Sequence, residues 1–131
     1  VSRLDHDEPM LNRTPPGGIE DTTTPSAMAH SLRGLVLGQA LSSASRERLT
    51  GRLVNCKTGA NRLRAGLPKD WKIADKTGNN GKDASGDIAV SWPRPGVPIL
   101  ICVYTRGGTP TARQTETVFT DIGRIVGEQL A

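Results

Sequence analysis

Two short segments of the chain hold residue types that could do chemistry. Lys-Thr-Gly at 76–78 closes a stretch from Trp71 whose composition predicts a strand. At a sheet edge, such a strand can place an ammonium and a hydroxyl beside a substrate carboxylate, and a glycine lets a flat ligand lie against the backbone. Glu8 and Asn12 lie four positions apart on a loop that turns at Pro9. A carboxylate held there could deprotonate a water molecule.

The string Lys-Thr-Gly occurs twice, so its setting has to decide which copy is functional. The copy at 57–59 follows a helical stretch and leads into Ala-Asn-Arg-Leu, and we interpret it as a connection. The copy at 76–78 ends a predicted strand, which is the setting that the chemistry requires. We therefore expect the second copy to form the site.

These segments, with the residues around them, resemble the second half of a class A serine β-lactamase. The motifs of that family are Ser-x-x-Lys, Ser-Asp-Asn and Lys-Thr-Gly, together with a glutamate that acts through a water molecule. The supporting strings are Arg-Leu-Asp-His-Asp-Glu at 3–8 and Asp-Thr-Thr-Thr-Pro at 21–25. The resemblance covers essentially the whole chain, from the omega loop to the C-terminal helix.

The resemblance implies roles for seven residues. Glu8 and Asn12 would hold the water that hydrolyses the acyl-enzyme, and Lys76 would complete the catalytic set. The substrate-binding residues would be Thr77, Gly78, Asn79 and Arg62. Asn79 would give a backbone N–H to the oxyanion hole, a contribution typically worth about 2.7–4 kcal/mol.

Two positions depart from the pattern of many family members. His6 stands where many have an arginine that pairs with the aspartate matching Asp21, so His6 either bonds Asp21 or is a solvated loop residue. Ser85 stands where many have an arginine that supports the substrate carboxylate. Other members bring that guanidinium from the position of Arg62, which would otherwise be a surface helix arginine.

The nucleophile motifs Ser-x-x-Lys and Ser-Asp-Asn do not occur in the sequence. The chain therefore resembles one half of an active site, and the resemblance implies β-lactam hydrolysis through a serine acyl-enzyme. A penicillin-binding transpeptidase or carboxypeptidase is the alternative within the fold, although it would lack Glu8 and Asn12. A non-catalytic fragment or partner half is the other alternative. The implied partners are β-lactam antibiotics, as substrates or covalent inhibitors, and the missing N-terminal half, in an otherwise monomeric bacterial protein that is periplasmic or secreted.

Composition excludes several other classes. The 131 residues include 17 basic and 13 acidic side chains without a basic run, and one Tyr and one Phe, which argues against nucleic-acid binding. No stretch approaches the about 18 consecutive apolar residues of a membrane span. We expect no metal and no cofactor, because neither Cys56 nor Cys102 has neighbours at metal-ligand spacing. The two cysteines are expected to be unpaired and largely buried, although a disulfide would suit an exported protein.

The order of predicted elements indicates one α+β domain of the β-lactamase/transpeptidase type. Its expected parts are an omega-type loop (1–24), a helical part (25–70), a three-stranded antiparallel meander (71–105) and a C-terminal helix (110–131). The helices are expected at 25–38, 45–55 and 60–65, and the strands at 71–77, 87–92 and 98–105. The third strand is apolar without alternation, which predicts cover on both faces. The last helix presents an apolar stripe of Val118, Ile122, Ile125, Val126 and Leu130. By the resemblance, the meander belongs to a five-stranded sheet whose other two strands are absent from this chain.

Overall fold

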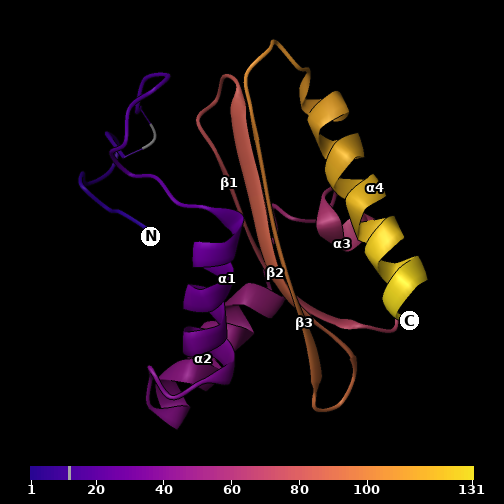
Figure 1. Cartoon of the computed structure of the whole chain (residues 1–131). Helices are drawn as coiled ribbons and strands as arrows, with labels where there is room; N and C mark the ends of the chain where they lie inside the picture. The colour runs from indigo at the N-terminus through magenta and orange to yellow at the C-terminus, as the bar shows by residue number, and fades with distance from the viewer. Residues whose placement is uncertain (12) are drawn as a thin grey trace.

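The computed structural model describes residues 1–11 and 13–131 (Figure 1). Asn12 therefore lies outside the described residues. The elements in chain order are α1 (Pro25–Leu32), the π-helix η1 (Arg33–Leu37), α2 (Ser43–Val54), α3 (Leu63–Gly66), β1 (Lys72–Asn79), β2 (Ala84–Arg94), β3 (Val97–Arg106) and α4 (Ala112–Leu130). The α+β class predicted from the sequence is confirmed. None of the helices in this described part is long and apolar enough to cross a membrane.

The three strands form an antiparallel sheet in the order β1-β2-β3. The register sets Thr77 opposite Asp87 and Gly78 opposite Gly86. β2 is longer than the predicted 87–92 at both ends, because it pairs with β3 from Ala84 onward and pairing resumes at Arg94 after an irregularity that begins at Ser91. The bulge accommodates the proline between them, which has no N–H to give to a ladder.

Helices cover both faces of the sheet. In Figure 1, α1 and α2 lie on one side of the strands, and α3 and α4 lie on the other. The core on the α3 and α4 side contains Leu63, Leu67, Trp71, Ile73, Ala89, Ile101 and Phe119. The core on the α1 and α2 side contains Leu32, Val36, Leu53, Ala74 and Val90. β3 contributes Ile101 to the first cluster and Leu100 to the edge of the second, so the prediction of a strand covered on both faces is confirmed.

The C-terminal helix buries only part of the predicted apolar stripe. Its buried residues are Phe119, Gly123 and Gly127. Three members of the predicted stripe are about half exposed, namely Val118, Ile125 and Leu130. The physical reason is close packing on α3, because a Cβ on Gly123 would lie 2.4 Å from the carbonyl oxygen of Leu63. Ile122 and Val126 flank this glycine contact and pack on the core as predicted.

The residues before α1 form a long loop with turns but no helix or strand among those described. α1 begins where the sequence predicted, since the Thr24 side chain accepts a hydrogen bond of 3.1 Å from the N–H of Ala27. Proline at the first helical position reinforces this start. The loop is thereby fixed at its C-terminal end to the layer of helices beside the sheet.

Candidate active site

A cleft of about 400 Å³ lies where the end of β1 meets the N-terminal loop. Four predicted site residues line it, namely Lys76, Thr77, Gly78 and Asn79. The loop contributes Leu11, Thr14 and residues 21–23, and the neighbouring strands contribute Ser85, Gly86 and residues 104–106 among others. A hydrogen bond of 3.2 Å from Arg106 to the carbonyl of Thr14 ties the loop to β3. Residues distant in sequence therefore surround one space.

The end of β1 presents its polar groups to this cleft. Lys76 is exposed, and its Nζ donates to the carbonyl of Thr77 at 2.6 Å. A Cβ on Gly78 would meet nothing within 4 Å, so the space above this residue is open to a ligand. The strand ends at Asn79, whose side chain accepts the backbone N–H of Gly81 at 2.9 Å and starts the turn.

The other Lys-Thr-Gly copy lies beside the site, a proximity that sequence reasoning missed. The hydroxyls of Thr58 and Thr77 are hydrogen-bonded at 2.5 Å. A Cβ on Gly59 would lie 1.7 Å from Oδ2 of Asp75, so the chain passes directly against β1 there. The interpretation of 57–59 as a connection agrees with the absence of any helix or strand at these positions. The contact could not be found from spacing, since nothing local in the sequence links Thr58 to β1.

Arg62 reaches across the ends of two strands. Its Nη1 donates to the carbonyls of Gly78 at 3.1 Å and Gly86 at 2.7 Å. Its guanidinium carbon lies 5.3 Å from the centroid of the Phe119 ring, within the range of a cation–π contact. Arg62 is therefore held against the strand ends, whereas the alternative placed it on the surface of a helix. Arg62 precedes α3 as its N-cap residue and is not among the residues that line the cleft.

Glu8 lies on the exposed turn at residues 8–11. The peptide bond between Glu8 and Pro9 is cis. The residues that line the cleft include Leu11 and Thr14 of the same loop but not Glu8. The structure thus brings Leu11 and Thr14 of this loop to the strand motif.

The two ends of the loop are joined by His6 and Asp21. Nδ1 of His6 lies 2.6 Å from Oδ2 of Asp21. Oδ1 of Asp21 accepts the backbone N–H groups of Asp5 at 2.6 Å and His6 at 3.0 Å. The N–H of Asp21 in turn donates to the Asp5 carboxylate at 2.9 Å. Of the two alternatives for His6, bonding to Asp21 is confirmed.

The electrostatics of this junction favour a charged pair. The hydrogen bond to Asp21 raises the pKa of the His6 ring above its usual value. Burial disfavours ionisation of Asp21, but hydrogen bonds from the N–H of Asp5 and from His6 outweigh it and lower the pKa of this carboxyl. The protonated ring and the carboxylate therefore coexist in mildly acidic solution.

A pair of buried carboxylates lies on β1 and β2, and sequence reasoning did not identify it. Asp75 accepts hydrogen bonds from Arg64, including one of 2.9 Å from Nε, and Oδ2 of Asp87 accepts the N–H of Leu63 at 3.2 Å. Both carboxylates are 0% exposed. Burial, followed by the charge of Asp75, raises the pKa of Asp87 to about 7. Within the described residues Oδ1 of Asp87 has no hydrogen-bond partner, which leaves this atom free to carry a proton.

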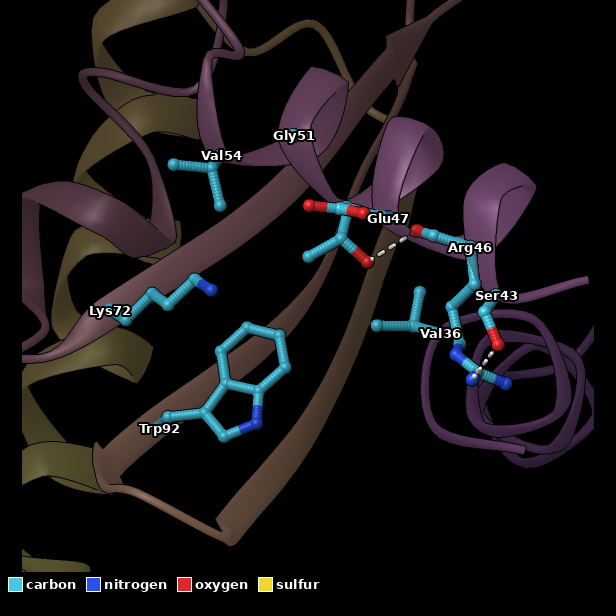
Figure 2. Close-up of a pocket in the computed structure, with 9 residues that line it drawn as sticks. Val36, Ser43, Arg46, Glu47, Gly51, Val54, Lys72 and Trp92 are labelled. Atoms are coloured by element: carbon cyan, nitrogen blue, oxygen red, sulfur yellow. Dashed lines mark hydrogen bonds between the residues drawn. The ribbon is translucent and has the colours of Figure 1, made fainter. Parts of the chain in front are cut away.

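A second cavity, of about 480 Å³, lies between α2 and the opposite end of the sheet. Figure 2 shows Lys72 and Trp92 on the strands, with Val54 and Glu47 facing them from α2. Nζ of Lys72 lies 5.2 Å from the centroid of the Trp92 ring. This cavity opens at the start of β1, whereas the cleft of the predicted site opens at its end.

Comparison with known proteins places the chain in a family. A family model described as the β-lactamase enzyme family matches residues 2–130. A β-lactamase of Stenotrophomonas maltophilia is 48% identical over 126 residues, which are 95% of this chain and 42% of the relative. A β-lactamase of Mycobacterium bovis is 46% identical over 133 aligned positions, which cover 100% of this chain and 43% of the relative.

Solved structures agree with these matches. An ancestral class A β-lactamase superposes with a TM-score of 0.94 at 50% identity, covering 99% of this chain and 50% of the other. A β-lactamase from Xanthomonas campestris superposes with a TM-score of 0.93 at 45% identity, covering 99% of this chain and 49% of the other. The sheet and its helices thus match part of the class A β-lactamase fold, and the chain spans about half the length of these relatives. The chain belongs to the β-lactamase enzyme family.

Proposed function

We propose that this chain is the C-terminal half of a serine β-lactamase. The whole enzyme opens the β-lactam ring by serine attack and releases the product by hydrolysis of the acyl-enzyme. The nucleophile comes from the N-terminal half of the fold, because this chain contains neither Ser-x-x-Lys nor Ser-Asp-Asn. The observation that carries the proposal is the cleft of about 400 Å³ in which residues 76–79 meet the N-terminal loop.

β1 binds the substrate through its side chains and its backbone. The ammonium of Lys76 and the hydroxyl of Thr77 bind the substrate carboxylate, because hydrogen bonds to an ionised group are stronger than those between neutral groups. Within the described residues β1 pairs only with β2, so its second edge has backbone groups free to bond a ligand. The N–H of Asn79 donates to the developing oxyanion from this edge. The open space over Gly78 accommodates the flat bicyclic ligand.

Glu8 is the base for deacylation in this proposal. It deprotonates the water that attacks the acyl-enzyme ester, and Asn12 helps to hold that water. Support comes from the resemblance of the loop sequence to class A enzymes and from the junction of His6 with Asp21, which closes the loop. The deacylating residues also distinguish a β-lactamase from a transpeptidase of related fold.

Arg62 supports the substrate carboxylate alongside Lys76 and Thr77. Its bonds to the carbonyls of Gly78 and Gly86 hold the guanidinium beside two residues that line the cleft. Ser85 lines the cleft but offers only a neutral hydroxyl. The substrates are β-lactam antibiotics, and the same proposal takes the enzyme to be a monomer that is exported to the periplasm or secreted.

Mass spectrometry of the full-length enzyme and of this chain alone tests the proposal. Full-length enzyme quenched after mixing with benzylpenicillin should show an acyl adduct that disappears as product forms. The isolated chain should show no adduct, because each of its serines lacks the lysine three positions on. An adduct on the isolated chain, or no acylation of the full-length protein, would overturn the half-site assignment.

A further inference from the structure

Two consecutive residues of β2 hold the segment that carries Arg62. The carbonyl of Gly86 accepts the Arg62 guanidinium at 2.7 Å, and the carboxylate of Asp87 accepts the N–H of Leu63 at 3.2 Å. Because Arg62 and Leu63 are adjacent, one bond fixes the end of the side chain and the other fixes the backbone from which it projects. Neither bond alone would determine where the guanidinium lies.

The other side of this segment is held by α4. The Thr120 hydroxyl is within 3.2 Å of the carbonyl of Asn61 and 3.4 Å of that of Arg62. The ring of Phe119, which is fully buried, lies against the guanidinium. Arg62 is therefore confined between α4 and the two strands. One further contact comes from β2, where the buried carboxylate of Asp87 accepts the backbone N–H of Leu63 at the start of α3.

Asp87 also faces the substrate-binding strand. It lies directly opposite Thr77 in the antiparallel register, and it is 0% exposed. A residue at this point can hold Arg62 at a fixed position relative to Thr77 without touching the ligand. Replacing a buried acceptor of this kind leaves a backbone N–H unsatisfied, which is costly.

We propose that Asp87 is a positioning residue for Arg62, with its carboxylate anchoring the first turn of α3 so that the guanidinium stays at the ends of β1 and β2. This proposal rests on the proposed function, in which Arg62 supports the substrate carboxylate. Asp87 makes no contact with substrate. Its effect passes through Leu63 to Arg62 and is confined to substrates that carry a carboxylate.

The groups facing Asp87 shift the pKa of its carboxyl. Asp75 faces it from β1, Arg64 from α3, and Arg62 from the position before α3, while α4 contributes the uncharged Phe119 to the same core. Burial, the Asp75 charge and the weaker opposing effects of Leu63 N–H and the two arginines leave the pKa of Asp87 at about 7. The amide of Leu63, which bonds to this carboxylate, should therefore report the titration.

Steady-state kinetics of the full-length enzyme test the proposal with three variants. Asp87→Ala removes the acceptor and should raise KM for benzylpenicillin about tenfold while kcat stays within about twofold, the size expected for losing one well-placed charged contact. Asp87→Asn retains an acceptor oxygen and should keep KM within about twofold of the parent. Asp70→Ala, at an exposed carboxylate before β1, is the matched control and should change neither constant.

Two further measurements separate positioning from general structural support. Arg62→Ala combined with Asp87→Ala should be no worse than Arg62→Ala alone, since both changes act on one guanidinium. A β-lactam whose carboxylate is esterified should be turned over alike by the parent and by Asp87→Ala. Equal KM increases for both substrates, or additive effects in the double variant, would overturn the proposal.

Nuclear magnetic resonance of the Leu63 amide tests the contact between Asp87 and Leu63 without turnover. In the parent enzyme its chemical shift should titrate with a midpoint near the pKa of Asp87, about 7, and in Asp87→Asn it should not. This readout applies if Asp87→Ala does not fold, and also if the enzyme does not hydrolyse β-lactams. A Leu63 amide whose chemical shift is the same in the parent and in Asp87→Asn at every pH from 5 to 9 would show that Asp87 does not hold Leu63, and this result would overturn the positioning role.

Discussion

Replacing Asp87 by asparagine should change how the stability of the enzyme depends on pH. The carboxyl is 0% exposed and its pKa is about 7, compared with an ordinary value of 3.8. Between these values the folded protein binds a proton that the unfolded chain does not bind. The contribution of Asp87 to the free energy of unfolding therefore falls as pH rises from about 4 to 7 and is constant above pH 7. Asparagine has the same shape and does not ionise, so the variant lacks this decline.

The size of the effect follows from the same two values. A difference between 3.8 and about 7 corresponds to at most on the order of 4 kcal/mol, at about 1.4 kcal/mol for each tenfold change in proton affinity. Asp87→Asn should thus gain up to this amount relative to the parent between pH 4 and pH 8. The His6–Asp21 pair also titrates in this range, but it is present in both proteins and its contribution cancels in the comparison.

Urea unfolding of the full-length enzyme at pH 5, 6, 7 and 8 measures this difference. The free energies of unfolding of parent and variant should diverge from pH 5 to about pH 7 and differ by a constant amount from there to pH 8, with unchanged slopes in urea. Asp70→Asn, at an exposed position, should run parallel to the parent. If Asp87→Asn also ran parallel to the parent across this range, then Asp87 would be ionised throughout and the reasoning from its burial would be refuted.

Three other predictions concern the proposed site. Glu8→Gln should slow deacylation far more than acylation, so acyl-enzyme should accumulate in mass spectra after mixing with a penicillin; turnover at the parental rate would contradict the role of Glu8. Arg62→Ala should lower kcat/KM for carboxylate-bearing substrates by about 1.5–3 kcal/mol, and Ser85→Ala by less; the reverse ranking in steady-state kinetics would contradict the role of Arg62. The raised pKa of His6 means that its bond to Asp21 stabilises the loop fully below the unfolded value of about 6.5 and is lost as pH rises through the folded value. Amide exchange of the loop, corrected for intrinsic rates, should therefore be faster at pH 8 than at pH 6, and His6→Arg should remove most of that difference, whereas equal protection in the parent at both pH values would show that something else closes the loop.

Local signals in the sequence account for the predicted elements. Thr24 and Pro25 fix the start of α1 because they supply a side-chain cap and a preset backbone angle within a few residues. The strand that ends in Lys76-Thr77-Gly78 was predicted from composition, and the structure places this motif at the end of β1. The loop before α1 was predicted from its prolines and glycines, and it has no helix or strand among the described residues.

Tertiary structure decided the features that depend on residues far apart in the chain. The bond between Thr58 and Thr77 spans 19 positions, and the bond between Leu63 and Asp87 spans 24. No periodicity or motif encodes such contacts, because they arise only when residues 58–63 pack against the sheet. The buried face of α4 was predicted only in part for the same reason, since a glycine contributes to a buried face only when another backbone approaches it, as Leu63 approaches Gly123. The sequence by itself determined the chemistry available at the end of β1, and packing determined which buried groups hold it in place.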